Sequence, residues 1–94
     1  MNMIKYYRKH IAHPAMRQID LARKLRDAGL SQCWQKDISR WEHGLHVPDI
    51  DVLEYLADLI GVSIADLRVN IINSRRELTK IKKYDFETQQ YKII

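Results

Sequence analysis

A short segment ahead of Gly44 carries four side chains that can hydrogen-bond the edges of nucleic-acid bases. They are Gln35, Lys36, Ser39 and Arg40. Lysine and arginine can donate to N7 and O6 of guanine, and glutamine can pair with N6 and N7 of adenine. With Trp34, Ile38 and Trp41 turned inward, these four side chains lie on or near the outer face of a helix. Such a face can enter the major groove of duplex DNA, because no bulky apolar residue obstructs it.

Other chemistry has less support in the sequence. The candidate metal ligands are two His-x-x-His pairs and the single cysteine, namely His10, His13, His43, His46 and Cys33, and their spacing fits no zinc signature. The chain has no glycine-rich phosphate loop and no evident pair of carboxylates in an inward cleft. We therefore expect no metal, no cofactor and no enzymatic activity. A lone cysteine cannot form an intramolecular disulfide, which fits a reducing compartment.

Length and charge limit the class of protein further. The chain has 94 residues, enough for one small domain, and its 46% hydrophobic content can build a core. Nine Lys and Arg against four Asp and Glu make residues 1–48 basic. Residues 49–67 hold five acids and no Lys or Arg, and residues 68–83 hold six bases and one acid. This predicts a basic face or end suited to polyanions, although an ordinary solvated surface has the same charges.

Hydrophobic spacing predicts five helices in residues 1–67 and no strand among them. The first helix covers 3–11 and ends before His13-Pro14, since the residue before proline avoids the helical region. The second begins near 15–17 and ends at Gly29. The residues expected to point inward are Ile4, Tyr7 and Ile11 in the first helix and Ile19, Ala22 and Leu25 in the second.

The remaining helices follow the same logic. The third helix ends at Gly44, the fourth runs from Asp49, its expected N-cap, to Gly61, and Ser63 with Asp66 opens the fifth. Their expected inward residues include Leu53, Leu56, Ala57, Ile60 and Leu67. The predicted fold class is a compact all-α five-helix bundle that contains a helix-turn-helix, with residues 68–94 as a C-terminal extension.

The extension has an apolar seam with heptad-like spacing. It consists of Leu67, Ile71, Leu78 and Ile81, with basic flanks. Two alternatives remain open from the sequence: the seam contacts a second copy of the chain, or it packs back on its own bundle. The tail, YDFETQQYKII, is either a frayed terminus or a short strand that pairs only in a dimer.

Residues 16–67 resemble the phage-repressor-like helix-turn-helix family of the Cro and xenobiotic-response-element type. The resemblance rests on the segments MRQIDLARKL, ISRWEHG and VPDIDVLEYLADLIGVSIADL. It implies that Gln35, Lys36, Ser39 and Arg40 read bases and that Gln18 holds a DNA phosphate. Further candidates for contacts with the DNA backbone are Arg17, His43 and His46.

Two departures from the family pattern concern this site. About six additional residues lie between Leu25 and Ile38, so we expect an extended second helix and a longer turn. The recognition helix then starts within Ser31–Gln35, with Ser31 or Trp34 as its N-cap. If Ser31 is the N-cap, Gln32 and Cys33 become additional contact candidates. The family often pairs the acid at Glu42 with an arginine at the position of Ile11, so this pair is absent or is made by Arg8.

The function expected from the resemblance is a sequence-specific regulator of transcription in the cytoplasm, with no membrane-spanning segment. It acts as a repressor that binds a near-palindromic operator as a homodimer and excludes polymerase, with half-sites about 34 Å apart. A phage repressor, a restriction controller and an antitoxin all fit. The alternative is a protein-interaction module that binds a partner through the acidic helix or the C-terminal extension.

Overall fold

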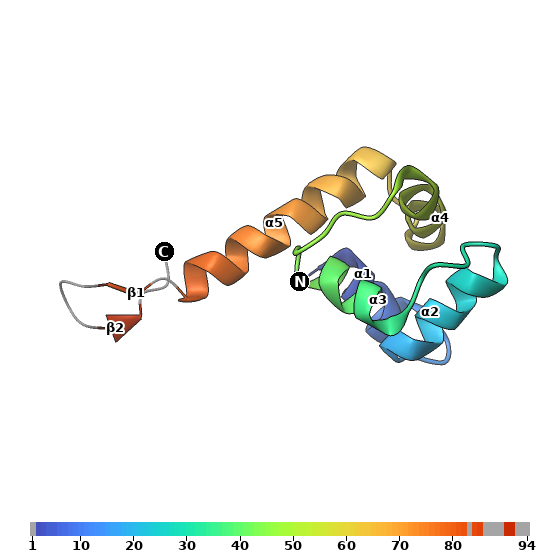
Figure 1. Ribbon diagram of the computed structural model, residues 1–94, viewed down its shortest axis with the longest axis horizontal. Coiled ribbons are helices and arrows are strands. Elements are labelled where there is room, and N and C mark those ends of the chain that lie inside the picture. Colours follow the sequence, from blue (N-terminus) through green and yellow to red (C-terminus); the bar gives the residue numbers. More distant parts are fainter. Residues whose placement is uncertain (1, 83, 86–89, 92–94) are drawn as a thin grey trace.

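A computed structural model describes the backbone of residues 2–82, 84–85 and 90–91 and the side chains of residues 2–75. Its elements are α1 (Met3–Tyr6), the π-helical η1 (Tyr7–Ile11), α2 (Gln18–Asp27), α3 (Gln35–Glu42), α4 (Ile50–Ile60), α5 (Ile64–Lys82), β1 (Tyr84–Asp85) and β2 (Gln90–Tyr91). Because α1 and η1 are continuous, the described chain has five helices (Figure 1). The all-α prediction is confirmed.

The buried Asn2 caps the start of the first helix, and the second half of this helix, η1, is π-helical. The Asn2 carboxamide oxygen accepts hydrogen bonds from the backbone N–H groups of Ile4 and Lys5 at 2.9 and 3.3 Å. Ile4 and Tyr7 are buried as predicted, but Ile11 is exposed. The reason is the π-helical turn, in which the Ala12 N–H donates to the Tyr7 carbonyl oxygen five residues earlier. A residue four positions after Tyr7 therefore leaves the buried face.

Helix α2 buries a stripe that differs from the predicted one. Ala22 and Leu25 point into the core as expected, and Leu21 joins them with no exposed surface. Ile19 was expected inward, but its side chain is 42% exposed. It lies outside the stripe centred on Leu21, Ala22 and Leu25, so the prediction for Ile19 was wrong.

The two later helices complete the core. Leu53, Leu56 and Ala57 of α4 are buried, whereas Ile60 is only partly buried. Asp49 occupies the N-cap position of α4, as predicted, but its side chain makes no capping hydrogen bond. At the start of α5, the Asp66 N–H donates to the Ser63 hydroxyl at 3.0 Å. The predicted serine cap of this helix is therefore present.

Helix α5 continues through the boundary that we predicted between residues 67 and 68. Leu67 and Ile71 have no exposed surface and belong to the core of their own chain. Of the two alternatives left open by the sequence, packing back on the chain's own bundle is therefore correct for these two residues, and the dimer seam is wrong for them because their side chains already lie in the core. The side chains of Leu78 and Ile81 lie outside the described residues.

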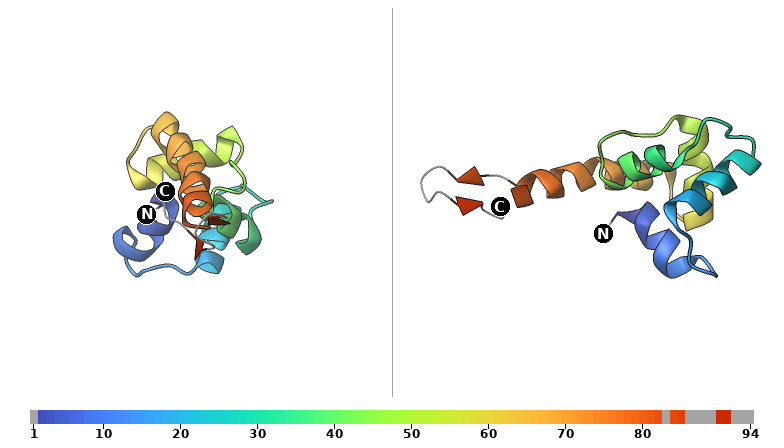
Figure 2. Two further views of the ribbon diagram at one scale, coloured as in Figure 1. Left: turned by 90° about the vertical axis from the view of Figure 1, so that its left-hand side faces the viewer. Right: turned by 60° about the horizontal axis from the view of Figure 1, so that its bottom comes forward.

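The C-terminal part of helix α5 projects from the cluster formed by the other helices and leads to the short hairpin (Figure 2). Strands β1 and β2 pair antiparallel with each other, with Tyr84 opposite Tyr91. The strand in the tail therefore pairs within one chain. Within the described residues, none of the helices combines the length and apolar character that crossing a membrane requires.

Candidate nucleic-acid interface

Helix α3 begins at Gln35, which settles the uncertain start of this helix in favour of Trp34 as its N-cap. The Trp34 N–H donates to the Asp37 carboxylate at 2.9 Å, so an acid three residues into the helix satisfies this backbone group. The longer turn is the seven-residue connection 28–34, as expected. Trp34 itself was expected inward, but it is 53% exposed. Its backbone is extended (φ −121°, ψ 169°), so its side chain does not follow the helical wheel.

The outer and inner faces of α3 separate as the sequence predicts. Ile38 and Trp41 are buried, whereas Gln35, Lys36 and Arg40 are exposed and Ser39 is half-buried. In the part of the chain that the structure describes, no ion pair or side-chain hydrogen bond involves Gln35, Lys36 or Arg40. Their donors are therefore available to a ligand. The four candidate base-reading residues share one accessible surface.

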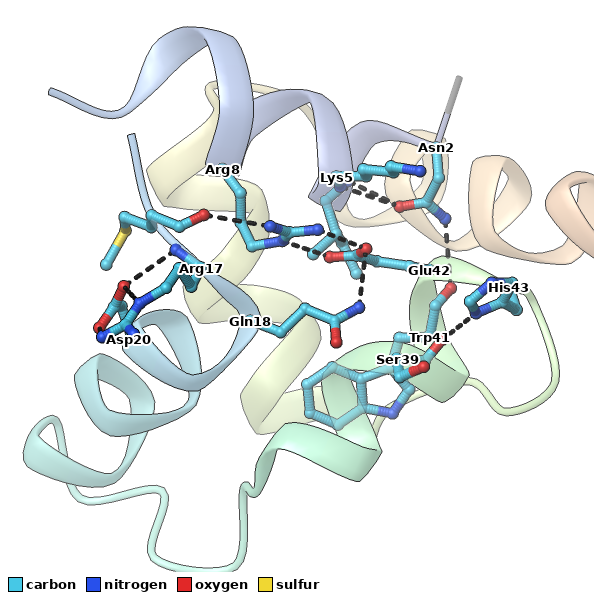
Figure 3. Close-up of polar contacts among 12 residues, drawn as sticks. Asn2, Lys5, Arg8, Arg17, Gln18, Asp20, Ser39, Trp41, Glu42 and His43 are labelled. Carbon is cyan, nitrogen blue, oxygen red and sulfur yellow. Dashed lines mark hydrogen bonds and ion pairs between the residues drawn. The ribbon is translucent and has the colours of Figure 1, made fainter. Parts of the chain in front are cut away.

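A buried ion pair fixes the other end of α3 (Figure 3). Arg8 Nε lies 2.6 Å from Glu42 Oε2, and Arg8 Nη2 lies 2.7 Å from Glu42 Oε1. Both side chains are almost completely buried, at 7% and 3% exposure. Of the two alternatives for Glu42, the one with Arg8 is correct. The bidentate geometry supplies a strong charge-assisted contact that ties α3 to the first helix.

The start of α2 joins the Arg8–Glu42 ion pair in one cluster of polar contacts. The Gln18 Nε2 group donates to Glu42 Oε1 at 3.2 Å, so its carboxamide bridges α2 to α3 (Figure 3). The Arg8 Nη1 group donates to the Met16 carbonyl oxygen at 3.1 Å and holds the segment before α2. Gln18 therefore has a structural contact in addition to its predicted role at a phosphate. The cluster fixes the start of α2 relative to α3.

Arg17 lies at the edge of this surface and is engaged by Asp20. The Arg17 N–H and Nε donate to Asp20 Oδ2 at 2.9 and 3.0 Å. Hydrogen bonding to Arg17 lowers the pKa of Asp20, and the same contact raises the pKa of Arg17. The Arg17 side chain is still 80% exposed, so this surface pair leaves it accessible to a phosphate.

The additional contact candidates divide by burial. His43, His46 and Gln32 are exposed, and His43 Nδ1 lies 2.7 Å from the Ser39 carbonyl oxygen. Cys33 is buried, and burial raises the pKa of its thiol. Cys33 therefore cannot reach DNA as its predicted role requires. It anchors the turn to the core instead.

Sequence reasoning missed three residues that hold this surface. Asn2 donates to the Trp41 carbonyl oxygen at 3.2 Å and to the Ser74 hydroxyl at 2.9 Å, which joins α3 to α5. Arg26 and Asp37 fix the turn and the start of α3. The signal for Asp37 was present, because an acid three residues after an N-cap recurs in RQID and WQKD. No local pattern marks the long-range contacts of Asn2.

Among the described residues, no group of three or more His, Cys, Asp or Glu side chains is arranged to hold a metal ion. No protein-family model, curated protein or solved structure matches this chain. The interpretation of the α3 surface therefore rests on the geometry above and on the motifs in the sequence.

Proposed function

We propose that this chain is a sequence-specific DNA-binding regulator of transcription. It acts in the cytoplasm as a repressor that occludes its operator. The observation that carries the proposal is the outer face of α3, where Gln35, Lys36 and Arg40 are exposed and their side chains form no hydrogen bond or ion pair within the described residues. A helix with such a face can enter the major groove and read base edges, since it offers donors there and no large apolar side chain of its own.

The rigidity of this face supports the same function. Recognition of base edges is stronger when the helix that carries the reading side chains is fixed before binding, because ordering it on binding reduces affinity. Glu42 is fixed by Arg8 and Gln18 at one end of α3, and the Trp34 N–H is bound by Asp37 at the other. Ile38 and Trp41 pack into the core between these ends. The helix can therefore present its outer face without reorganising.

The charge distribution also favours a polyanion. Lys36 and Arg40 lie on the outer face of α3, while the exposed acids Asp51, Glu54 and Asp58 belong to a different helix, α4. A ligand with negative phosphates is attracted to the first surface and repelled by the second. This asymmetry orients the domain on DNA with α3 toward the duplex.

The proposed homodimer needs a contact other than Leu67 and Ile71, because both are buried in their own chain. Among the described residues of α5, the exposed large apolar side chains are Val69 and Ile72, three positions apart on the helix. Two copies joined through such a face can present two α3 helices to a near-palindromic site. Sedimentation of the full chain measures whether the dimer forms.

The test is selection of bound sites from a pool of random duplex DNA, followed by binding measurements on the selected site. We expect a preferred sequence, and we expect Arg40→Ala to relax the preference at one base pair and weaken binding to the selected site by about 10-fold or more. The matched control is Arg68→Ala on α5, which removes the same charge from an exposed position outside α3. It should leave the preference unchanged.

Two results would contradict the proposal. Binding that falls steeply with salt and selects no site is purely electrostatic association with the phosphate backbone. Equal effects of Arg40→Ala and Arg68→Ala would show that net charge matters and the α3 surface does not. Either result would favour the alternative of a protein-interaction module, for which the exposed acids of α4 offer a surface.

A further inference from the structure

The most exposed aromatic residue next to the candidate interface is Trp34, at the start of α3. Its side chain is 53% exposed, whereas the other tryptophan, Trp41, is buried. Single exposed apolar side chains are common on protein surfaces, so what distinguishes Trp34 is its place beside the candidate interface. Trp34 directly precedes Gln35 and Lys36, two of the proposed base-reading residues.

The indole ring is held in place although it is exposed. The guanidinium carbon of Arg26 lies 4.2 Å from the centroid of the Trp34 ring, at the distance of a cation–π contact. The same arginine donates from Nη1 to the Cys33 carbonyl oxygen at 2.8 Å. Cys33, the residue directly before Trp34, is buried in the core, so it fixes the end of the turn that leads to Trp34. One side of the ring therefore contacts Arg26, and half of the side chain still faces solvent.

The position of the ring fits one feature of duplex DNA. In a helix-turn-helix, residues at the N-terminal end of the recognition helix contact base edges in the major groove. The apolar group that the major groove offers is the 5-methyl group of thymine, and apolar side chains recognise it by contact. A ring fixed before binding loses little conformational freedom when it makes such a contact.

We infer that Trp34 is a specificity-determining residue that packs against the methyl group of a thymine in the bound site. This inference rests on the proposed function and deepens it, because it names one base and one atom group that the protein reads. The contact adds an apolar element to the polar readout by α3. Arg26 acts as the positioning residue that holds the ring.

The test replaces each thymine of the selected site in turn by deoxyuridine, which removes only the methyl group. For the wild-type chain, we expect one thymine per half-site at which this replacement weakens binding about fourfold, the factor that corresponds to one buried methylene-sized group. Trp34→Ala should weaken binding to the thymine site and abolish the difference between thymine and uracil there. Trp34→Phe keeps an aromatic ring and should retain most of the difference.

Ile19→Ala is the matched control, since Ile19 is another exposed apolar residue, 42% exposed, at the start of α2. It should leave the difference between thymine and uracil unchanged. Circular dichroism of each variant checks that the fold is intact, and Trp34→Phe supplies a second reading if the alanine variant unfolds.

The outcomes separate the two proposals. A Trp34→Ala variant that loses the same factor on thymine and uracil sites overturns the inference and assigns Trp34 to the structure of the turn. A wild-type chain that selects a site but shows no dependence on any methyl group overturns it as well and leaves the DNA-binding function standing. A wild-type chain that selects no site overturns the proposed function itself.

Discussion

Gly44 follows the C-cap of α3 and lies directly against α5, so Gly44→Ala tests the packing between the end of α3 and α5. Its φ is +68°, in the left-handed region that favours glycine. A Cβ atom at this position would lie 2.5 Å from the Ile71 carbonyl oxygen and closer still to the Arg75 backbone nitrogen. Both are backbone atoms of a helix, which cannot move aside as the end of a flexible side chain can.

Two contributions add in this variant. Placing a non-glycine residue in the left-handed region costs about 1–2 kcal/mol. Overpacking against fixed atoms costs about 1–3 kcal/mol more. Gly61→Ala is the matched control, because Gly61 has φ +85° and no heavy atom lies within 4 Å of its added Cβ. Gly61→Ala carries only the first cost, so Gly44→Ala should be less stable than Gly61→Ala by about 1–3 kcal/mol.

Urea unfolding followed by circular dichroism measures this difference, with the slope of the transition compared between variants. In a domain of this size, each kcal/mol also shifts the melting temperature by about 4–8 °C. Equal losses in the two variants would refute the close approach of α3 and α5 at Gly44. A larger loss in Gly61→Ala would refute the assignment of both contributions.

Two further predictions concern the ion pairs around the candidate interface. Glu42→Gln leaves Arg8 buried without its counter-charge, so urea unfolding should show a loss of stability of about 3–5 kcal/mol. The double variant that also carries Arg8→Met should lose less stability than the sum of the losses in the two single variants. Additive losses would contradict the coupling between Arg8 and Glu42. The hydrogen bond to Arg17 lowers the pKa of Asp20 in the folded protein below its value in the unfolded chain. The ionised Asp20 therefore stabilises the fold at pH values above the unfolded pKa, and this stabilisation is lost as the pH falls through the folded pKa. Arg17→Ala should raise the pKa of Asp20 in an NMR titration of the carboxyl group, and an unchanged titration would show that Arg17 has no such effect.

The sequence predicted the positions of the helices more accurately than it predicted which single residues are buried. Apolar spacing, Pro14 and Gly61 located the helix ends, since these signals act on neighbouring residues along the chain. The same spacing failed for Ile11, where a π-helical turn changes the register, and for Trp34, whose extended backbone takes it off the helical wheel. These two failures occur where the backbone departs from regular α-helix, whereas Ile19 lies in the regular helix α2 and is exposed because it falls outside the buried stripe of that helix.

For the candidate interface too, some features could be predicted from the sequence and others could not. The polar face formed by Gln35, Lys36 and Arg40 follows from the sequence, because the period of a helix alone sets which side chains share a face. For the partner of Glu42, the sequence left two alternatives open, no ion pair or a pair with Arg8. The family pattern indicated the position of Ile11, and only the folded chain selects Arg8, 34 residues away.

The sequence by itself determined that this protein is helical, where its helices lie and which side of α3 is polar. These properties depend on residues within a few positions of one another. The tertiary structure decided that Cys33 and Ile71 are buried, that Trp34 is exposed against Arg26, and that Gly44 touches α5. Such outcomes depend on contacts between distant segments, and a local pattern cannot fix which of several apolar or charged side chains the packed core accommodates.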